Sequence, residues 1–449
     1  MELLLKYNKI INNFVWGPYM LVFLVGTGVY YTIRTNFMSI TKMGYVLKNT
    51  LFKMFDKKVR GEGEITPFQA VSTALAATIG TGNIAGVATA IAIGGPGAVF
   101  WMWLSALFGM ATKFGEVVLA IHYREKTEDG RFVGGPMYYI QNGLGWKWLA
   151  MIFAFFGALA AFGIGNMVQG NSVADSLNAT FGMPHWISGI LLAIAAALVI
   201  IGGLKRIASF TERLVPIMAL FYVIGSLIIL VTFAKDIPAA FSLIFSSAFT
   251  GTAAMGGFAG STIMMAARYG VARGVFSNEA GLGSAPIAHA AATTDSAVRQ
   301  GLWGIFEVFM DTIVVCSMTA LTIVVTGVWD SGLDGAALTT EAFNRGLPGP
   351  GGIIVAIGIL LFAYSTILSW SYYGERCAEY LFGSKINKFY RIIWIPFIYI
   401  GSVGGLELMW DIADTLNGLM AIPNLIGLLG CSGIVFKLTR EYFRNKNAL

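Results

Sequence analysis

A short polar, glycine-rich segment lies inside an otherwise apolar stretch of the chain: Thr78-Ile79-Gly80-Thr81-Gly82-Asn83. Each glycine weakens a helix by about 1 kcal/mol relative to alanine, so the segment predicts a helix interruption. An unwound turn exposes main-chain carbonyls to a cation. It also aims the amides of the next helical piece at an anion such as a carboxylate. The residue types therefore predict an ion-binding turn.

Close packing is the alternative for this segment. Gly82 and Gly86 are four residues apart, which is the spacing of a small-residue face between membrane helices. A dinucleotide-binding loop does not fit, because no strand precedes the glycines and no βαβ unit surrounds them. Ion binding and helix packing both remain open from the residues alone.

A second polar segment interrupts a later apolar stretch. Ser277, Asn278 and Glu279 precede a glycine-rich run that ends at Pro286. Ionisable residues inside apolar segments are costly and are functional candidates by default. Alternatively, 277–286 forms a capped surface helix after a basic loop, and the interruption then moves to 255–261.

Further polar residues occur singly inside apolar runs. Gln169 and Asn166, three apart, share one helical face and could bind a ligand or only a neighbouring helix. Glu307 and Asp311, four apart, could serve a cation or proton pathway or form a buried pair with a basic residue. Lys113 with Glu116 predicts a structural pair near a helix end.

The elements that carry these residues are membrane helices. Of 449 residues, 56% are hydrophobic and 12% charged, against about 25% charged in an ordinary soluble domain. Each span needs roughly 20 apolar residues. About eleven runs qualify: 14–33, 66–93, 96–123, 148–173, 184–203, 214–233, 255–292, 302–328, 351–373, 392–408 and 412–436. The chain is therefore predicted to be an all-α polytopic membrane protein.

The two interrupted runs are the second and the seventh. This spacing is typical of two five-helix units of opposite orientation, each beginning with a discontinuous helix. We expect one transmembrane domain over 1–449, with an extra helix at 14–33 and repeats at about 66–233 and 255–436. Lysines and arginines gather in alternate loops, which predicts an outside N-terminus and a cytoplasmic C-terminus.

Several function classes are excluded by the residues. No Ser/His/Asp or Cys/His set has catalytic spacing, and no phosphate-binding GxxxxGK[ST] motif is present. The three cysteines are too scattered for a disulfide framework or a metal knot. The net charge of +6 lies in short loops, which does not indicate nucleic-acid binding. We expect no enzyme activity and no cofactor.

The string Gly274-Val275-Phe276-Ser277-Asn278-Glu279-Ala280-Gly281-Leu282-Gly283-Ser284 closely resembles the signature of the alanine or glycine:cation symporter family. The segment 78–83 is similar to that family's first discontinuous helix. The resemblance covers essentially the whole chain. It implies the leucine-transporter fold, sodium as the coupling ion, and alanine or glycine as substrate, in the plasma membrane.

The resemblance also implies site residues. Amides around Thr81 and Gly82 would face the substrate carboxylate, and an Ala-x-x-Thr pattern in the ninth run would serve a second sodium. Ile367 stands where a second hydroxyl is frequent, which would weaken that sodium site. The expected sodium ligands are Ala76, Thr78, Ile79, Asn83, Ala363 and Thr366.

The remaining expected residues fall in two groups. Phe276 and Trp370 could wall a methyl-sized pocket, or belong to the core. The expected substrate-binding residues are Thr78, Ile79, Gly80, Thr81, Gly82, Gln169, Arg273, Gly274, Val275, Phe276, Ser277, Thr366 and Trp370. The expected gating or structural residues are Asn278, Glu279, Glu307 and Asp311.

The function implied is a sodium-driven symporter that alternates between outward-open and inward-open states. Sodium and substrate would each raise the affinity for the other, because binding linkage is reciprocal. Proton coupling on the same fold is the main alternative, in which Glu279, Glu307 or Asp311 titrates. An ion channel is a further alternative, and it would conduct without uphill accumulation.

Overall fold

The computed structural model describes residues 2–54, 60–250, 262–404 and 407–447. Within them the chain is almost entirely helical, apart from a small hairpin of β1 (Glu125–Lys126) and β2 (Phe132–Val133). The helices up to the hairpin are α1 (Glu2–Val15), α2 (Pro18–Arg34), α3 (Met38–Thr41), α4 (Met43–Asn49), η1 (Leu51–Lys53), α5 (Pro67–Thr78), η2 (Gly82–Gly86), α6 (Val87–Gly94) and α7 (Gly97–His122).

The middle of the chain adds α8 (Pro136–Leu144), α9 (Lys147–Phe162), η3 (Gly163–Met167), α10 (Val168–Phe181), α11 (His185–Ile200), α12 (Gly203–Thr232), η4 (Ala234–Asp236) and α13 (Ile237–Thr250). The last part contains α14 (Ile263–Asn278), α15 (Ala285–His289), α16 (Ala297–Val308), η6 (Phe309–Cys316), α17 (Ser317–Val325), α18 (Gly335–Gly346), α19 (Gly351–Phe382), α20 (Ile386–Val403) and α21 (Glu407–Asn447).

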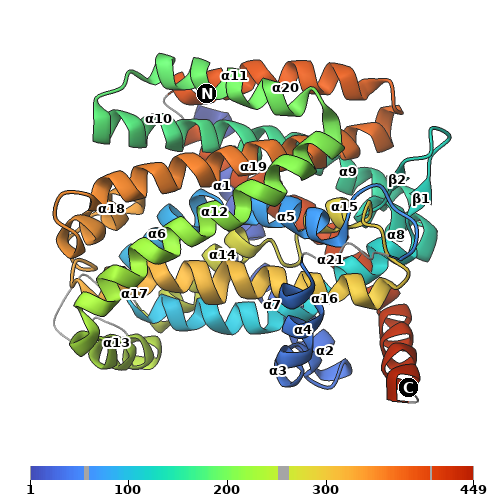
Figure 1. Ribbon diagram of the computed structural model, residues 1–449, viewed down its shortest axis with the longest axis horizontal. Coiled ribbons are helices and arrows are strands. Elements are labelled where there is room, and N and C mark those ends of the chain that lie inside the picture. The colour runs from blue at the N-terminus through green and yellow to red at the C-terminus, as the bar shows by residue number, and fades with distance from the viewer. Residues whose placement is uncertain (1, 55–59, 251–261, 405–406, 448–449) are drawn as a thin grey trace.

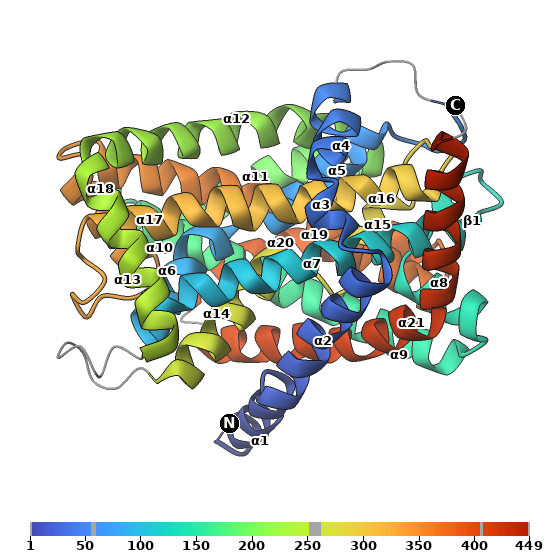
Figure 2. The same cartoon turned by 90° about the horizontal axis from the view of Figure 1, so that it is seen from below.

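Each of the eleven predicted runs corresponds to a helix or a broken helix. Seven described helices are long and apolar enough to cross a membrane, and the bent pair of α5 with the helix that follows it makes an eighth. The helix α16 runs along the longest axis of the molecule, and α12 crosses it obliquely toward α13 (Figure 1). α13 runs across one end of the bundle, near α18, whereas α8 and β1 lie at the other end (Figure 2).

The first predicted interruption is confirmed. α5 begins with a capping box between Thr66 and Gln69, and Pro67 occupies its first position, where its missing N–H costs nothing. The helix ends at Thr78, and Ile79 has a ψ of 86°. The chain then resumes as a π-helical turn and bends by 52°.

The second predicted interruption is also confirmed, at 279–284. α14 ends at Asn278, and Glu279 takes the left-handed conformation with a φ of 55°. Gly281 and Gly283 follow with φ values of 91° and 84°, which glycine adopts without steric cost. The surface-helix alternative is wrong, because every residue from 277 to 292 is buried. The alternative break at 255–261 lies outside the described residues.

Basic residues near the run ends lie in helices rather than in loops. α12 already begins at Gly203, so Lys205, Arg206 and Arg213 are helical. Arg376 lies in α19, and the last basic residues of the chain lie in α21. Lysine and arginine are good helix formers whose long side chains reach the interface, so helices continue past their apolar segments.

Candidate functional site

The unwound turn after α5 is held by its own asparagine. The Asn83 side-chain oxygen accepts a hydrogen bond of 2.8 Å from the Gly80 amide. Thr78 donates weakly to carbonyls within its own helix. Because an amide oxygen has two lone pairs, Asn83 keeps one acceptor position for a cation while it caps Gly80.

The last turn of α5 lies against α19 at two hydroxyl side chains. Thr366 Oγ1 lies 3.1 Å from the Ala76 carbonyl oxygen, and Ser365 Oγ lies 3.0 Å from the same oxygen. The predicted Ala76 and Thr366 are therefore brought together. Sequence reasoning missed Ser365, because it looked for a second hydroxyl at the buried Ile367. The hydroxyl directly before Thr366 was the available signal.

Gly80, Thr366 and Gln169 converge beside the turn. A Cβ placed on Gly80 would lie 2.7 Å from Thr366 Oγ1 and 3.7 Å from Gln169 Oε1. The π-helical turn η3 precedes Gln169, whose amide donates to the Ile164 carbonyl at 2.9 Å. Among the buried side-chain oxygens of the described residues that have no hydrogen-bond partner, Thr81 Oγ1 and Gln169 Oε1 belong to this region. Such atoms suit the ammonium group of a ligand.

The end of α14 closes one side of the turn. A Cβ on Gly82 would lie 3.3 Å from the Phe276 ring and 3.4 Å from Ser277 Cα. The guanidinium of Arg273 lies 5.4 Å from the centre of the Phe276 ring. Gly274 instead packs against α7, where a Cβ would lie 2.8 Å from Ser105 Oγ. Of these predicted residues, Phe276 and Ser277 contact the first interruption.

A cavity of about 650 Å³ adjoins the turn. Its inner part is lined by Thr81, Gly82 and Phe276, and its outer part by 334–341 at the end of the molecule that carries α18. Gly86 also lines it, and a Cβ there would meet no atom within 4 Å. Close packing therefore holds for Gly82, which lies against α14, but not for Gly86, which faces the cavity.

Asp311 links the two interruptions. Its carboxylate accepts from Asn83 Nδ2 at 2.7 Å, from Ser277 Oγ at 3.0 and 3.1 Å, and from Thr312 Oγ1 at 2.8 Å. All these donors are neutral, and no basic side chain of the described residues forms an ion pair with it. A buried carboxylate surrounded in this way stays ionised most readily when a cation is bound near it.

Glu279 connects the second interruption to α19. Its carboxylate accepts a hydrogen bond of 2.9 Å from Trp370 Nε1 and another from Ser284. Trp370 is therefore positioned by the second interruption and lies one helical turn after Thr366. Asn278 caps the backbone of Ala280 at 2.9 Å and donates to Thr312 at 3.0 Å.

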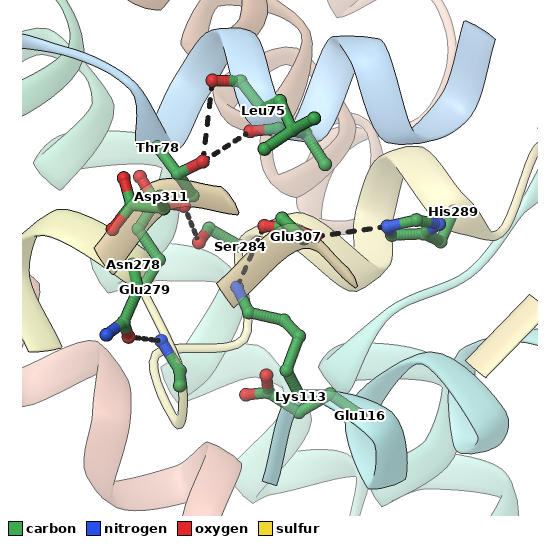
Figure 3. A network of polar contacts seen from close by, with 12 residues as sticks. Leu75, Thr78, Lys113, Glu116, Asn278, Glu279, Ser284, His289, Glu307 and Asp311 are labelled. Carbon is green, nitrogen blue, oxygen red and sulfur yellow. Dashed lines mark hydrogen bonds and ion pairs between the residues drawn. The ribbon is translucent and has the colours of Figure 1, made fainter. Parts of the chain in front are cut away.

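A buried charge network of residues from α7, α15 and α16 lies next to the second interruption (Figure 3). Lys113 forms an ion pair of 3.2 Å with Glu307, and both side chains are fully buried. His289 lies 3.2 Å from the other oxygen of Glu307 and 2.9 Å from Gln300. The predicted pair of Lys113 with Glu116 is wrong, because Glu307 from α16 reaches the ammonium instead. Of the two alternatives for Glu307, the buried pair is confirmed.

At the end of the molecule opposite the cavity mouth, ion pairs connect the β-hairpin and α20 to α19. Arg131, next to β2, pairs with Asp129 at 2.7 Å and with Glu379 of α19 at 2.9 Å. Hydrogen bonds from Thr127 and Arg131 lower the pKa of Asp129 to about 2. Arg391 of α20 bonds to the same end of α19 through Glu375. The site thus has an open end and a bonded end, as alternating access requires.

The chain matches the Sodium:alanine symporter family over residues 1–449. It is 53% identical over 440 residues to the "Sodium/alanine symporter AgcS" of Methanococcus maripaludis, covering 96% of each chain. It is 38% identical over 454 residues to the "Putative sodium/proton-dependent alanine carrier protein YrbD" of Bacillus subtilis, covering 97% of this chain and 92% of that protein.

The crystal structure of MhsT in complex with L-phenylalanine is similar with a TM-score of 0.58 and 14% identity. The match covers 85% of this chain and 99% of that one. At this identity the likeness shows the fold, and it confirms the leucine-transporter fold. The protein is a multi-pass membrane transporter and not an enzyme, and it couples amino-acid movement to a cation. The chain therefore belongs to the sodium:alanine symporter family.

Proposed function

We propose that this protein imports alanine and glycine together with sodium across the plasma membrane. The observation that carries this proposal is the pair of buried, unpartnered acceptors beside the unwound turn, Thr81 Oγ1, which also lines the cavity, and Gln169 Oε1, which lies near Gly80. They would accept hydrogen bonds from the substrate ammonium, while the amides near Gly82 would face its carboxylate. Both charged groups of a zwitterionic amino acid would then have partners at the turn.

The substrate side chain would point toward Phe276. The Phe276 ring already approaches Gly82 closely, since a Cβ there would lie 3.3 Å from it. A methyl group or a hydrogen leaves this wall in place, whereas a longer side chain requires the ring to move. Steric overlap rejects larger substrates more strongly than a missing methylene rejects smaller ones. This favours alanine and glycine over larger amino acids.

Sodium rather than a proton is the proposed coupling ion. Hydroxyl and carbonyl oxygens suit a hard cation, and Ala76, Ser365 and Thr366 bring such oxygens together. The Ile79 and Ala363 carbonyls would complete that site. Thr78 and Asn83 would provide oxygens to another. Asp311 supports the same proposal, because its four hydrogen bonds come from neutral donors and leave its negative charge to a bound cation.

Proton coupling is the second candidate. Asp311 and Glu279 are buried carboxylates at the two interruptions. A proton on either would neutralise it just as a neighbouring sodium ion would. The YrbD relative of Bacillus subtilis is described as "sodium/proton-dependent", which favours this second candidate.

Uptake of labelled alanine by proteoliposomes distinguishes sodium coupling from proton coupling. We expect an inward sodium gradient to drive accumulation above the external concentration, and unlabelled glycine to compete. Accumulation driven by a proton gradient without sodium would overturn the sodium assignment. Thr81→Val should raise the alanine KM by about fivefold or more, the worth of one hydrogen bond. Thr89→Val is the matched control, because Thr89 lines the same cavity on α6.

The proposed orientation has the N-terminus outside and the C-terminus in the cytoplasm. The hairpin residues Lys126 and Arg131 and the basic tail of α21 lie at the end opposite α18 (Figures 1 and 2). Basic residues favour the cytoplasmic side. The cavity would then open to the outside. Labelling of an engineered cysteine in the loop before α18 by a membrane-impermeant reagent in intact cells tests this orientation.

A further inference from the structure

An apolar groove of about 450 Å³ lies between three helices, well away from the unwound turn. α2, α7 and α14 pack against one another there, and Figure 2 shows them as neighbours. The α2 side of the groove runs from Pro18 to Val29, and its walls are almost wholly aliphatic or aromatic apart from Ser105 and Arg268. Val22, Gly26 and Met264 of the groove are exposed at the protein surface. The groove therefore faces the hydrocarbon of the membrane.

The length of the groove matches one leaflet. Pro18 to Val29 spans eleven helical steps, or about 16 Å at a rise of 1.5 Å per residue. One half of a typical hydrocarbon core is about 15 Å thick. α7 and α14 contribute residues close to their first turns, whereas the α2 residues lie inside the candidate span Lys6–Arg34. An acyl chain of one leaflet fits this length and this lining.

Arg268 supplies a charge at the entrance of the groove. It is half-buried and forms no ion pair with any carboxylate of the described residues; its guanidinium lies 5.9 Å from the centre of the Tyr269 ring. Side chains on a helix point back toward its N-terminus, so the guanidinium is directed to the membrane surface, where lipid phosphates lie. Charged groups at this depth are paired with a counter-charge.

We propose that the groove binds a phospholipid with a net anionic headgroup, whose phosphate pairs with Arg268 and whose acyl chain lies along α2. The arginine fork matches phosphate oxygens in geometry as well as in charge. The bound lipid would contact α14, which is the first half of the second broken helix. The site is separate from the amino-acid cavity, and its occupation does not depend on which cation drives transport.

Native mass spectrometry of the full-length protein tests the site. The protein is purified from membranes, exchanged into an equimolar mixture of phosphatidylglycerol and phosphatidylethanolamine, and examined for retained lipid. We expect the wild type to retain one phosphatidylglycerol in preference, and Arg268→Ala to lose that preference by about fivefold. Arg345→Ala removes an exposed arginine of α18 instead, and we expect it to behave as the wild type.

A second variant tests the acyl-chain part without removing a charge. A Cβ on Gly26 meets no atom within 4 Å, and Gly26 lines the groove, so Gly26→Phe places a ring where the acyl chain would lie. We expect Gly26→Phe to retain neither phosphatidylglycerol nor phosphatidylethanolamine, and to elute as a folded protein in size-exclusion chromatography. The proposal is overturned if Gly26→Phe retains phosphatidylglycerol as the wild type does, or if Arg268→Ala and Arg345→Ala retain it equally.

Discussion

Gly80 tests the geometry of the unwound turn most directly. A Cβ on Gly80 would lie 2.7 Å from Thr366 Oγ1, which is closer than side chains approach one another. For an ordinary contact of 3.4 Å, Thr366 Oγ1 must retreat by about 0.7 Å. The hydroxyl has one hydrogen, for which the carbonyls of Phe362 at 3.0 Å, Ala76 at 3.1 Å and Ala77 at 3.3 Å compete. Gly80→Ala therefore costs the contact of this hydroxyl with the end of α5.

The expected size follows from the hydrogen bonds. One hydrogen bond is worth about 1 kcal/mol net, so its loss raises the sodium concentration for half-maximal uptake by about fivefold. Gly86→Ala adds the same methyl group close to the turn, but its Cβ meets no atom within 4 Å. The control should therefore keep the sodium dependence of the wild type.

The assay is alanine uptake by proteoliposomes at a series of external sodium concentrations. A double-mutant cycle isolates the contact: in a Thr366→Ala background, Gly80→Ala should have no further effect, because the displaced oxygen is absent. Equal shifts in Gly80→Ala and Gly86→Ala would refute the reasoning. A full Gly80→Ala effect in the Thr366→Ala background would refute it as well.

Three further predictions concern the unwound turn and the buried charge network around Glu307. Asn83→Ala should raise the sodium concentration for half-maximal uptake by at least about fivefold, because it removes a cation oxygen and the cap of the turn; unchanged sodium dependence contradicts it. Gly82→Val should abolish alanine binding measured by equilibrium dialysis, whereas Gly433→Val, at an unobstructed position, should bind as the wild type; binding by Gly82→Val contradicts the carboxylate role. Lys113→Met leaves Glu307 buried without its cation and should lower the free energy of unfolding by about 3–5 kcal/mol in thermal denaturation. The exposed Lys235→Met should change it by less than about 0.5 kcal/mol, and equal effects would show that the buried pair adds no stability.

The two helix interruptions were predictable because their causes are local. Glycines and polar residues within a few positions of one another weaken the helix wherever it packs. The π-helical turn η6 carried no comparable signal in its sequence, whereas η3 contains Gly163, Gly165 and Asn166, a signal of the same kind that was not used. α13 was not predicted either, although its fourteen residues are mostly apolar, because it is too short for a complete span.

The partners of the polar residues were not predictable in the same way. Asn83 and Asp311 are 228 residues apart in the chain and 2.7 Å apart in space. Lys113 has Glu116 one helical turn away, yet it pairs with Glu307 of another helix. Which carboxylate reaches a buried ammonium depends on how the helices pack and rotate, and side-chain spacing along one helix does not contain that information.

By itself, the amino-acid sequence determined that this chain lies in a membrane, where its helices break, and to which family it is similar. These properties follow from composition and from short runs of neighbouring residues. Only the tertiary structure decided which hydroxyl joins Thr366 at Ala76, which carboxylate connects the two interruptions, and which acceptors stay unpaired beside the cavity. Such contacts join segments hundreds of residues apart, so they exist only once the helices have packed.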